Sequence, residues 1–398
     1  MNKRIAILGS TGSIGCSALE VIAHLGPPYR VVALSGHSQT DKLLEQARKH
    51  RPTAIALANN PPAVATELSR LGIKVYEGPD GLVELVRRDD IDLVLAAIVG
   101  AAGLPAVLAA VEARKTVALA NKEALVVAGS LLIPLAKKNN VQLLPVDSEH
   151  SAVFQAAQSG RLEEIKRVIL TASGGPFRQA SAKAIENATL QDALKHPTWR
   201  MGSKITIDSA TMFNKALEII EACWLFGLSP DKIEVLIHPE SIVHSMVEFI
   251  DGSVIAQLSP PDMRTPIQYA LTYPQRLPGI SRKLDLSKPF SLNFERPDPD
   301  RFPALRLGYD VARKGGTLGA VLNGANEAAV AAFTSGKIRF VQISKLVAAT
   351  IAAHQLQKSP SLDDLLQADK WARDTVDMTI NAGEAGQQVA RSPDSVKN

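Results

Sequence analysis

Cysteine is scarce in this 398-residue chain, and its scarcity excludes two kinds of site. Cys16 and Cys223 are the only cysteines, they lie far apart in the sequence, and neither belongs to a CxxC pair. We therefore expect neither a disulfide framework nor a thiolate zinc site. So few cysteines also fit a reducing compartment such as the cytoplasm.

Long apolar runs and strongly charged tracts are also missing. The longest apolar runs, such as residues 93–99, have the length of a strand and cannot span a bilayer. A strand predicted at residues 4–8 leaves no room for a signal peptide before it. A net charge of +4 is too small for a nucleic-acid-binding surface. We expect a cytoplasmic globular protein with no nucleic-acid or membrane partner and, at this length, several domains.

Short apolar runs alternate with amphipathic stretches in the first part of the chain. Strands that are buried on both faces are almost continuously apolar, and helical patterns separate these runs. Strand and helix in alternation predict an α/β fold with a Rossmann-like, doubly wound parallel sheet. The predicted strands are residues 5–8, 31–34, 54–57, 93–98, 116–119 and 142–146.

The pattern changes after Asp147. A central α+β domain is predicted, in which Asp251 and Gly252 join two strands in a hairpin. A proline-rich linker and a helical C-terminal domain follow. The predicted parts are an N-terminal domain at 1–147, a central domain at 148–273, a linker at 274–303 and a helical domain at 304–398.

A glycine-bearing loop follows the first predicted strand. Gly9, Gly12 and Gly15 form a GxxGxxG variant of the dinucleotide-binding fingerprint, directly before a predicted helix. A pyrophosphate could sit on the amides at the start of that helix. The alternative is that these glycines serve the turn alone.

The junction after the second predicted strand bears on which dinucleotide is bound. Sites for NAD place an acidic residue there, but this chain has no carboxylate before Asp41. His37 and Ser38 could instead donate to the 2′-phosphate of NADP. The sequence therefore favours NADP, unless these residues only form a polar turn.

Two carboxylates follow the last strand of the first predicted domain, where a ligand cleft would open. Asp147 and Glu149 would project to the same side of an extended segment. With a third carboxylate they would suit Mg²⁺ or Mn²⁺. An equally supported alternative makes Asp147 or Ser148 a helix N-cap, with Glu149 in the first turn.

A second polar cluster is predicted where a strand at residues 204–207 leads into a helix. Asn214 and Glu218 are four residues apart and Lys215 and Glu218 are three apart, so the three share one helix face. With Ser209 they could hold an anion and a metal ion. The commoner alternative is a solvated helix face with one ion pair.

Two loops accompany this cluster. The segment 173–176, Ser-Gly-Gly-Pro, could cradle a phosphate with its amides and the Ser173 hydroxyl. The loop that holds His196, Trp199 and Met201 is apolar enough to close over a ligand. In the alternative interpretation Trp199 is a core anchor.

Taken together, these segments resemble the 1-deoxy-D-xylulose 5-phosphate reductoisomerase family. The resemblance covers most of the chain in order. It rests on residues 9–15, 120–125, 145–150, 173–177, 196–202, 208–212, 238–241, 261–266 and 322–327. Ala216 and Ser259 depart from it, because the family usually has glycine at both positions.

The resemblance implies an oxidoreductase of isoprenoid precursor biosynthesis. The family isomerises 1-deoxy-D-xylulose 5-phosphate and reduces the product with NADPH to 2-C-methyl-D-erythritol 4-phosphate. A divalent metal (Mn²⁺, Mg²⁺ or Co²⁺), a sugar phosphate substrate and a homodimer are implied with it. The implied metal ligands are Asp147, Glu149 and Glu218, and Lys122 is implied as a further catalytic residue.

The resemblance also implies which residues contact the ligands. Those for the substrate are Lys122, Ser148, Glu149, Ser173, His196, Trp199, Met201, Ser209, Asn214, Lys215, Glu218 and Ser241. Those for the cofactor are Gly9, Thr11, Gly12, Ser13, Ile14, Gly36, His37, Ser38, Asn121, Glu123 and Gly202.

Two rival functions remain open from the sequence. One is an NADP-binding sensor without catalysis. The other is a reductase that acts on a sugar phosphate or a semialdehyde without rearranging its carbon skeleton.

Overall fold

The computed structural model describes residues 3–59, 61–199 and 201–391, with side chains up to residue 382. The chain divides into two compact units, each made of two segments. The first unit holds Met1–Ser173 and Glu221–Pro297, and the second holds Gly174–Ile220 and Asp298–Asn398. Within the described ranges, no helix is both long and apolar enough to cross a lipid bilayer.

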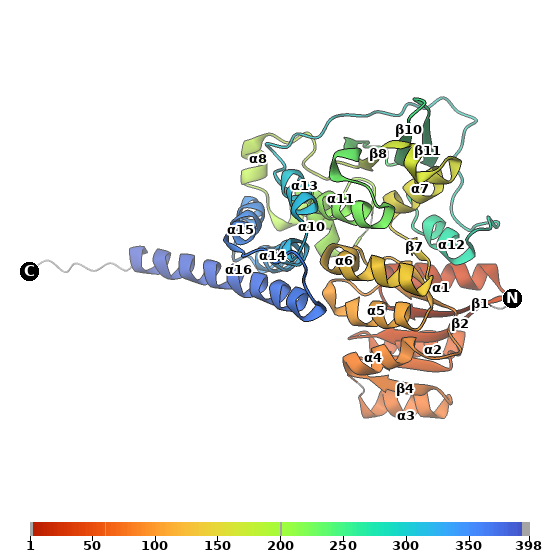
Figure 1. Cartoon of the computed structure of the whole chain (residues 1–398). Helices are drawn as coiled ribbons and strands as arrows, with labels where there is room; N and C mark the ends of the chain where they lie inside the picture. Colours follow the sequence, from red (N-terminus) through yellow and green to blue (C-terminus); the bar gives the residue numbers. More distant parts are fainter. Residues whose placement is uncertain (1–2, 60, 200, 392–398) are drawn as a thin grey trace, which may run out of the picture. The chain divides into compact units, whose positions relative to one another are not determined.

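A seven-stranded parallel sheet forms the start of the first unit (Figure 1). Its strand order is β4-β3-β2-β1-β5-β6-β7, so the chain extends the sheet on one side of β1 and then on the other. Because such crossovers are right-handed, the helices of the two halves cover opposite faces. The predicted Rossmann-like, doubly wound sheet is confirmed. The strands are β1 (Lys3–Leu8), β2 (Tyr29–Gly36), β3 (Ala54–Leu57), β4 (Lys74–Glu77), β5 (Leu93–Ala96), β6 (Thr116–Leu119) and β7 (Leu143–Pro145).

Apolar strand residues make the core of this sheet. Ile5, Ile7, Leu34, Leu93 and Leu95 are fully buried, and burial of each such side chain is worth about 1.5–3 kcal/mol as an upper limit. The helices between the strands are α1 (Ser13–Leu25), α2 (Thr40–His50), α3 (Pro62–Arg70), α4 (Gly78–Val86), α5 (Leu104–Glu112) and α6 (Lys122–Asn139).

A four-stranded mixed sheet completes the first unit, in the order β11-β10-β8-β9. β8 pairs in parallel with β9 and antiparallel with β10. Gly252, at φ +87°, turns the chain between β10 and β11, which confirms the predicted hairpin. The elements are α7 (Ser148–Ala156), β8 (Ile165–Ala172), β9 (Ile233–Ile237), β10 (Val243–Phe249), β11 (Val254–Leu258) and α12 (Arg264–Thr272).

The prediction of a strand at residues 204–207 is wrong, because this segment is the start of helix α10 (Ser203–Thr211). Its β-branched residues favour a strand locally. The helix buries Thr206, Ile207 and Ala210 together, and Lys204 pairs with Asp208 at 2.7 Å, one turn later. Packing of one helical face therefore overrides the local preference.

Helices make up the second unit. Between α13 and α10–α11 the contact is close, because a Cβ at Gly308 would lie 2.9 Å from the Cβ of Ala216. The family that the sequence resembles usually has glycine at position 216. Here the methyl group of Ala216 packs beside Gly308, which has no side chain. The helices are α8 (Ala182–Glu186), α9 (Leu190–Ala193), α10, the first part of α11 (Phe213–Phe226), α13 (Ala304–Lys314), α14 (Leu318–Thr334), α15 (Phe340–Ala353) and α16 (Leu362–Arg391).

The segment at residues 274–303, all of it described, forms neither helix nor strand. A single bridge joins its Glu295 to Ile237 of β9. The predicted linker composition and the irregular backbone agree, while the predicted domain boundaries remain predictions.

Candidate active site

The glycine loop lies where the strand order reverses, between the carboxyl ends of β1 and β5. Gly9 has φ +79°, and a Cβ there would lie 2.7 Å from the carbonyl oxygen of Ala97. A Cβ at Gly15 would lie 2.4 Å from the carbonyl oxygen of Gly9. Both positions therefore require glycine for the turn itself. Such a switch point is also where open α/β sheets bind ligands.

Helix α1 begins at Ser13 with Gly12 as its N-cap, and no side chain of the described residues caps its first turn. The amides at this end are therefore arranged as an anion site would need them. The loop is held from α2, because Lys42 donates to the carbonyl of Thr11 at 2.8 Å. Ile14 follows in the same first turn.

The residues predicted to select the 2′-phosphate lie at the end of β2. Gly36 is the last residue of that strand, and His37 and Ser38 are exposed beyond it. The position agrees with cofactor contact, and their role remains a prediction.

Asn121 caps helix α6 at the end of β6. Its carboxamide oxygen accepts from the amide of Ala124 at 2.9 Å, and its nitrogen donates to the carbonyl of Gly100 at 2.9 Å. The Asn121 carboxamide therefore links the segment after β6 to the segment after the neighbouring strand β5. Lys122 and Glu123 follow in the first turn of α6, and both are buried.

Lys122 forms an ion pair with Asp147, with 2.7 Å between Nζ and Oδ2. The pair is largely buried, with 8% and 15% of the two side chains exposed. A cation and an anion in this setting stabilise each other's charged form. The pair links the start of α6 to the start of α7.

The prediction that Asp147 and Glu149 lie in an extended segment is wrong. Helix α7 begins at Ser148, so Asp147 is the N-cap residue and Glu149 lies in the first turn. The carboxylate of Asp147 nevertheless makes no capping hydrogen bond to that turn, all of which is described. Carboxylate oxygens of Asp147 and Glu149 still lie within 4.8 Å of each other, and Ser148 donates to Glu149.

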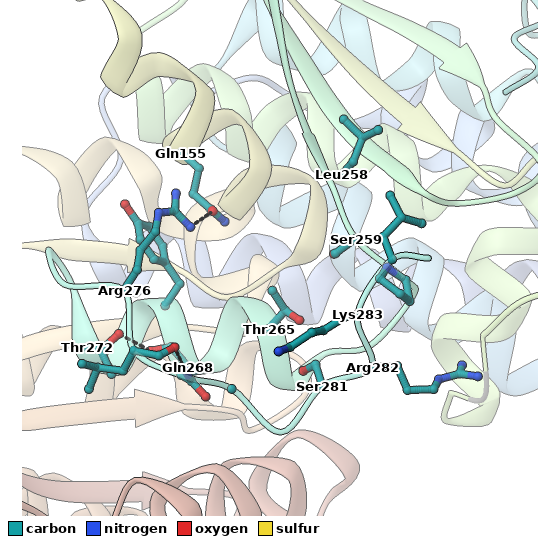
Figure 2. A pocket seen from close by; sticks show the side chains of 15 residues that line it. Gln155, Leu258, Ser259, Thr265, Gln268, Thr272, Arg276, Ser281, Arg282 and Lys283 are labelled. Carbon is teal, nitrogen blue, oxygen red and sulfur yellow. Dashed lines mark hydrogen bonds between the residues drawn. The ribbon is translucent and has the colours of Figure 1, made fainter. Parts of the chain in front are cut away.

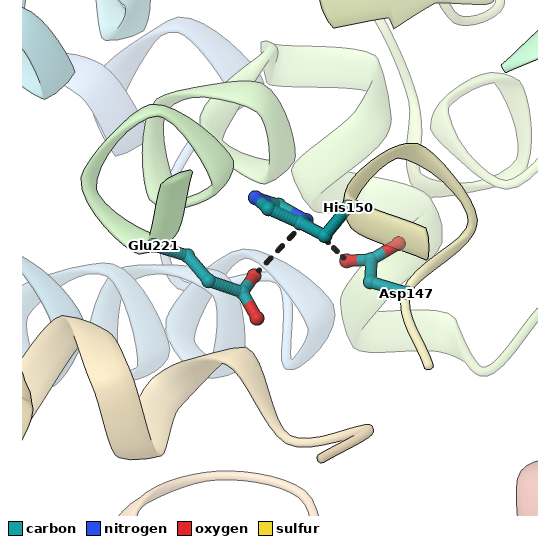
Figure 3. A group of neighbouring side chains, drawn as sticks. All are labelled: Asp147, His150 and Glu221. Atoms are coloured by element: carbon teal, nitrogen blue, oxygen red, sulfur yellow. Dashed lines mark ion pairs between the residues drawn. The ribbon is translucent and has the colours of Figure 1, made fainter. Parts of the chain in front are cut away.

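His150 and Glu221 adjoin this pair (Figure 3). The imidazole Nδ1 lies 3.4 Å from the Glu221 carboxylate and 4.0 Å from that of Asp147. His150 also stacks on Phe226, with ring centroids 6.3 Å apart. Both His150 and Glu221 are almost completely buried, so the imidazole lies between two carboxylates in the interior.

Ser241 lies just before β10, and His244 is the second residue of that strand. Ser241 is buried at φ +50°, a conformation that few residues other than glycine adopt. Burial lowers the pKa of His244, and the nearby charge of Glu149 opposes that shift. His244 Nε2 lies 3.0 Å from the carbonyl of Ser259. Ser259, the second departure from the family pattern, thus contacts the site through its backbone.

The second unit brings Asn214, Lys215 and Glu218 together at the start of α11. The Asn214 carboxamide donates to Glu218 Oε1 at 2.6 Å, and Lys215 pairs with the other carboxylate oxygen. Lys215 and Glu218 are 2% and 0% exposed, so the solvated-face alternative is wrong. A buried ion pair of this kind is costly to desolvate and marks a site more than it stabilises a fold.

The Ser-Gly-Gly-Pro loop meets Ser209 at the end of α10. Gly175 has φ +64°, and a Cβ there would lie 2.8 Å from the carbonyl oxygen of Ser209. Gly175 is therefore required for this close approach.

The predicted lid loop is organised by its own histidine. His196 Nδ1 accepts hydrogen bonds from the amides of Thr198 at 3.2 Å and Trp199 at 2.9 Å. Trp199 and Met201 are only half-buried, so Trp199 is not a core anchor. Gly202 is the N-cap of α10, whereas Arg200 lies outside the described residues.

Several buried polar residues were not predicted from the sequence. His150 and Glu221 carry no separate signal, although Glu221 is three residues from Glu218 on the same helix. In the second unit Asn326 donates to Asp208 at 2.8 Å, and both are buried. Asparagine within a helix of small apolar residues is the signal that could have found it.

Comparison with known proteins places the chain in a family. Models described as 1-deoxy-D-xylulose 5-phosphate reductoisomerase, its C-terminal domain, and DXP reductoisomerase C-terminal domain match residues 5–129, 143–226 and 258–375. The 1-deoxy-D-xylulose 5-phosphate reductoisomerase of Pelodictyon phaeoclathratiforme is 51% identical over 94% of this chain and 98% of its own. The chain belongs to the 1-deoxy-D-xylulose 5-phosphate reductoisomerase family. The predicted family is thereby confirmed.

Further members of the family agree. The enzyme from Chlorobaculum tepidum is 50% identical, over 95% of this chain and all of its own. A solved DOX-P reductoisomerase in complex with NADPH, fosmidomycin and magnesium is 42% identical with a TM-score of 0.92, over 96% of this chain and 99% of that one. The Zymomonas mobilis reductoisomerase in complex with NADPH is 41% identical with a TM-score of 0.89, over the same shares. The α/β fold and the predicted cofactor types, NADPH and a divalent metal, agree with these structures.

Proposed function

We propose that the chain converts 1-deoxy-D-xylulose 5-phosphate to 2-C-methyl-D-erythritol 4-phosphate, with NADPH as reductant and a divalent metal. The observation that carries this proposal is the family membership over 94% of the chain. The buried ionic groups at the starts of α6, α7 and α11 support it, because a fold needs no such groups for stability.

Asp147, Glu149 and Glu218 are the metal ligands in this proposal. Two of them already lie within 4.8 Å of each other. Glu218 lies on α11 about one turn before Glu221, which itself is within 4.8 Å of Asp147. Three carboxylates suit a hard divalent cation such as Mg²⁺ or Mn²⁺, which when bound polarises substrate oxygens.

Lys122 has two tasks in the proposed reaction. Its ammonium offsets the charge of Asp147, with which it pairs at 2.7 Å. Its remaining N–H groups can donate to the hydroxyls of the substrate, and Ser148 and Ser241 can add neutral hydrogen bonds beside it. The substrate's carbon chain is thereby oriented for rearrangement.

The substrate phosphate is held in the second unit in this proposal. Lys215 supplies the charge, Asn214 and Ser209 supply N–H and O–H donors, and Ser173 belongs to the adjoining loop. Binding energy gained at this group, remote from the reacting carbons, can help to close the lid loop.

The lid loop excludes water in this proposal. His196 fixes the backbone of Trp199, so the loop can move as an organised turn. Half-buried Trp199 and Met201 supply apolar surface for contact with the ligand. Closure would strengthen every charge interaction within the site.

NADPH supplies the hydride and binds, in this proposal, on the N-terminal sheet. Gly9, Thr11, Gly12, Ser13 and Ile14 would face its pyrophosphate. Gly36, His37 and Ser38 would face its adenosine 2′-phosphate. Asn121, Glu123 and Gly202 would contact the remainder of the cofactor.

Oxidation of NADPH in the presence of 1-deoxy-D-xylulose 5-phosphate and Mg²⁺ or Mn²⁺, with the product examined by NMR, tests the proposal. We expect metal-dependent NADPH consumption and a branched carbon skeleton. Consumption with an unrearranged product would identify a simple sugar-phosphate reductase. Absence of consumption although NADPH binds would identify a sensor.

We also propose a homodimer in the cytoplasm. β11 is an edge strand, and Val254, Ile255 and Leu258 along it are 36–49% exposed, while Ile250 in the turn before it is 68% exposed. An exposed apolar edge of this kind favours pairing with a second copy. Light scattering should give a dimer mass for the full chain and a lower mass for Ile255→Lys. A monomer at micromolar concentration would contradict the proposal.

A further inference from the structure

A cavity of about 320 Å³ lies in the first unit, beside α7, the end of β11, α12 and the segment after α12 (Figure 2). Fifteen residues line it, and none of them is a predicted metal, substrate or cofactor residue. Its volume is at the small end of the range for ligand sites. The cavity is therefore distinct from the predicted active-site residues.

The floor of the cavity is polar and ordered. Gln155, Gln268 and Thr272 are buried there. Gln268 donates to the carbonyl of Leu277 at 2.8 Å, and the Thr272 hydroxyl donates to the carbonyl of Gln268 at 3.0 Å. The bond from Gln268 joins α12 to the segment that covers the cavity, and the bond from Thr272 lies within the helix.

Arg276 is positioned at one side by two contacts. Its guanidinium lies 4.6 Å from the centroid of the Tyr269 ring and donates to Gln155 Oε1 at 2.9 Å. Gln155 is neutral, so the charge of Arg276 is positioned but not neutralised. Such a planar, fixed donor is suited to phosphate.

Lys283 brings a second positive charge. Figure 2 shows its ammonium pointing toward the side of the cavity where Arg276 lies, whereas the guanidinium of Arg282 points away. Among the described residues, no carboxylate lies within 4.0 Å of a nitrogen of Arg276 or Lys283. Two uncompensated cations beside one cavity favour a ligand with two negative charges.

The remaining wall is apolar. Leu258, Pro260, Leu277 and Leu284 line it. A ligand that carries only an anionic group would leave this apolar wall exposed to water. A short carbon chain on the ligand would cover the wall. Leu258 is shared with the exposed edge of β11, so the cavity opens next to the proposed dimer contact.

We propose that this cavity binds a small organic phosphate. The phosphate pairs with Arg276 and Lys283, and a short apolar chain lies against Leu258 and Leu284. A phosphate monoester is chosen over a carboxylate because it matches two cations with two charges. The site is separate from the proposed reaction, and its test does not depend on catalysis.

Titration calorimetry of the full chain with n-butyl phosphate tests this proposal. All proteins carry Lys215→Ala, which removes the predicted phosphate contact of the active site. In that background we expect Arg276→Gln and Lys283→Gln each to weaken binding about tenfold or more. Arg282→Gln is the matched control, and it should leave the affinity unchanged.

The chemistry of the ligand is tested by two further probes. n-Butanol lacks the phosphate and inorganic phosphate lacks the chain, so both should bind more weakly than n-butyl phosphate. Arg276→Lys keeps the charge and should recover part of the affinity that Arg276→Gln loses. Arg276 and Lys283 are exposed, and unchanged thermal unfolding of their variants will exclude misfolding. No binding in the Lys215→Ala background, or an affinity in Arg276→Gln and Lys283→Gln equal to that of the Lys215→Ala parent, overturns the proposal.

Discussion

Asn326 of α14 donates a hydrogen bond of 2.8 Å to the carboxylate of Asp208 in α10, and both side chains are buried. Asp208 also pairs with Lys204, at 2.7 Å. Through this carboxylate, a helix of the C-terminal region holds the segment that carries Ser209. The C-terminal helices therefore support the predicted phosphate-binding residues directly.

Replacing Asn326 with alanine should weaken that support. A buried acceptor that loses its donor costs about 1–3 kcal/mol, so the unfolding temperature should fall. The KM for 1-deoxy-D-xylulose 5-phosphate should rise as well, because Ser209 is no longer held. Thermal unfolding and steady-state kinetics measure the two effects.

Asn323→Ala is the matched control for this variant. Asn323 lies on the same helix and donates to Asp369 at 2.8 Å, away from α10. It should lower the unfolding temperature to a similar extent and leave KM unchanged. Equal KM values for both variants would show that Asn326 has only a structural role.

Glu149→Gln should abolish turnover and leave NADPH binding almost intact. The substitution keeps the size of the side chain but removes a charge that a divalent cation needs. Fluorescence titration measures NADPH binding, and NADPH oxidation measures turnover. Glu163→Gln, on an exposed acid, is the control and should behave as the wild type. Loss of cofactor affinity in Glu149→Gln would contradict the assignment as a metal ligand.

Lys215→Ala should raise the KM for the sugar phosphate with a smaller effect on kcat. The lost charge-assisted contact is worth roughly 1.5–3 kcal/mol, which corresponds to about 10- to 150-fold in KM. Lys195→Ala removes an exposed lysine instead and should leave KM unchanged. An unchanged KM in Lys215→Ala would place the phosphate elsewhere.

Cys223 should resist alkylation near neutral pH. Burial raises the pKa of its thiol from 9.0 to about 12, and the thiolate is the reactive form. Because this pKa is raised, the thiolate forms only as the pH rises toward 12. At pH 8 its reaction with iodoacetamide should be about a thousandfold slower than that of an unburied thiol, as followed by peptide mass spectrometry. Rapid modification of Cys223 in the folded protein would contradict this.

Much of the fold could be predicted from the sequence because its strands are buried on both faces. The run at residues 116–119 has the same bounds as β6, since each of its residues is apolar or β-branched. β4 escaped notice, because it lies at the edge of the sheet and only one of its four residues is buried. Its sequence, Lys-Val-Tyr-Glu, carries no continuous apolar signal.

The candidate site was predictable to a different degree in its two parts. The contacts of Asn214 and Lys215 with Glu218 follow from helical spacing alone, and the structure has them. The contact of Asn326 with Asp208 joins residues 118 apart in the chain. No local period relates such residues, so only the folded chain discloses that contact.

The two-segment construction of each unit has a consequence for biosynthesis. The first unit is incomplete until residue 297 has been made, and residues 174–220 must await partners that are made last. Asp208 leaves the ribosome well before the Asn326 that will bind it, since chains are made from the N-terminus. During that interval the apolar side chains of residues 174–220 lack the rest of the unit to which they belong. Nascent chains stalled before α14 should therefore be the species that chaperones hold longest.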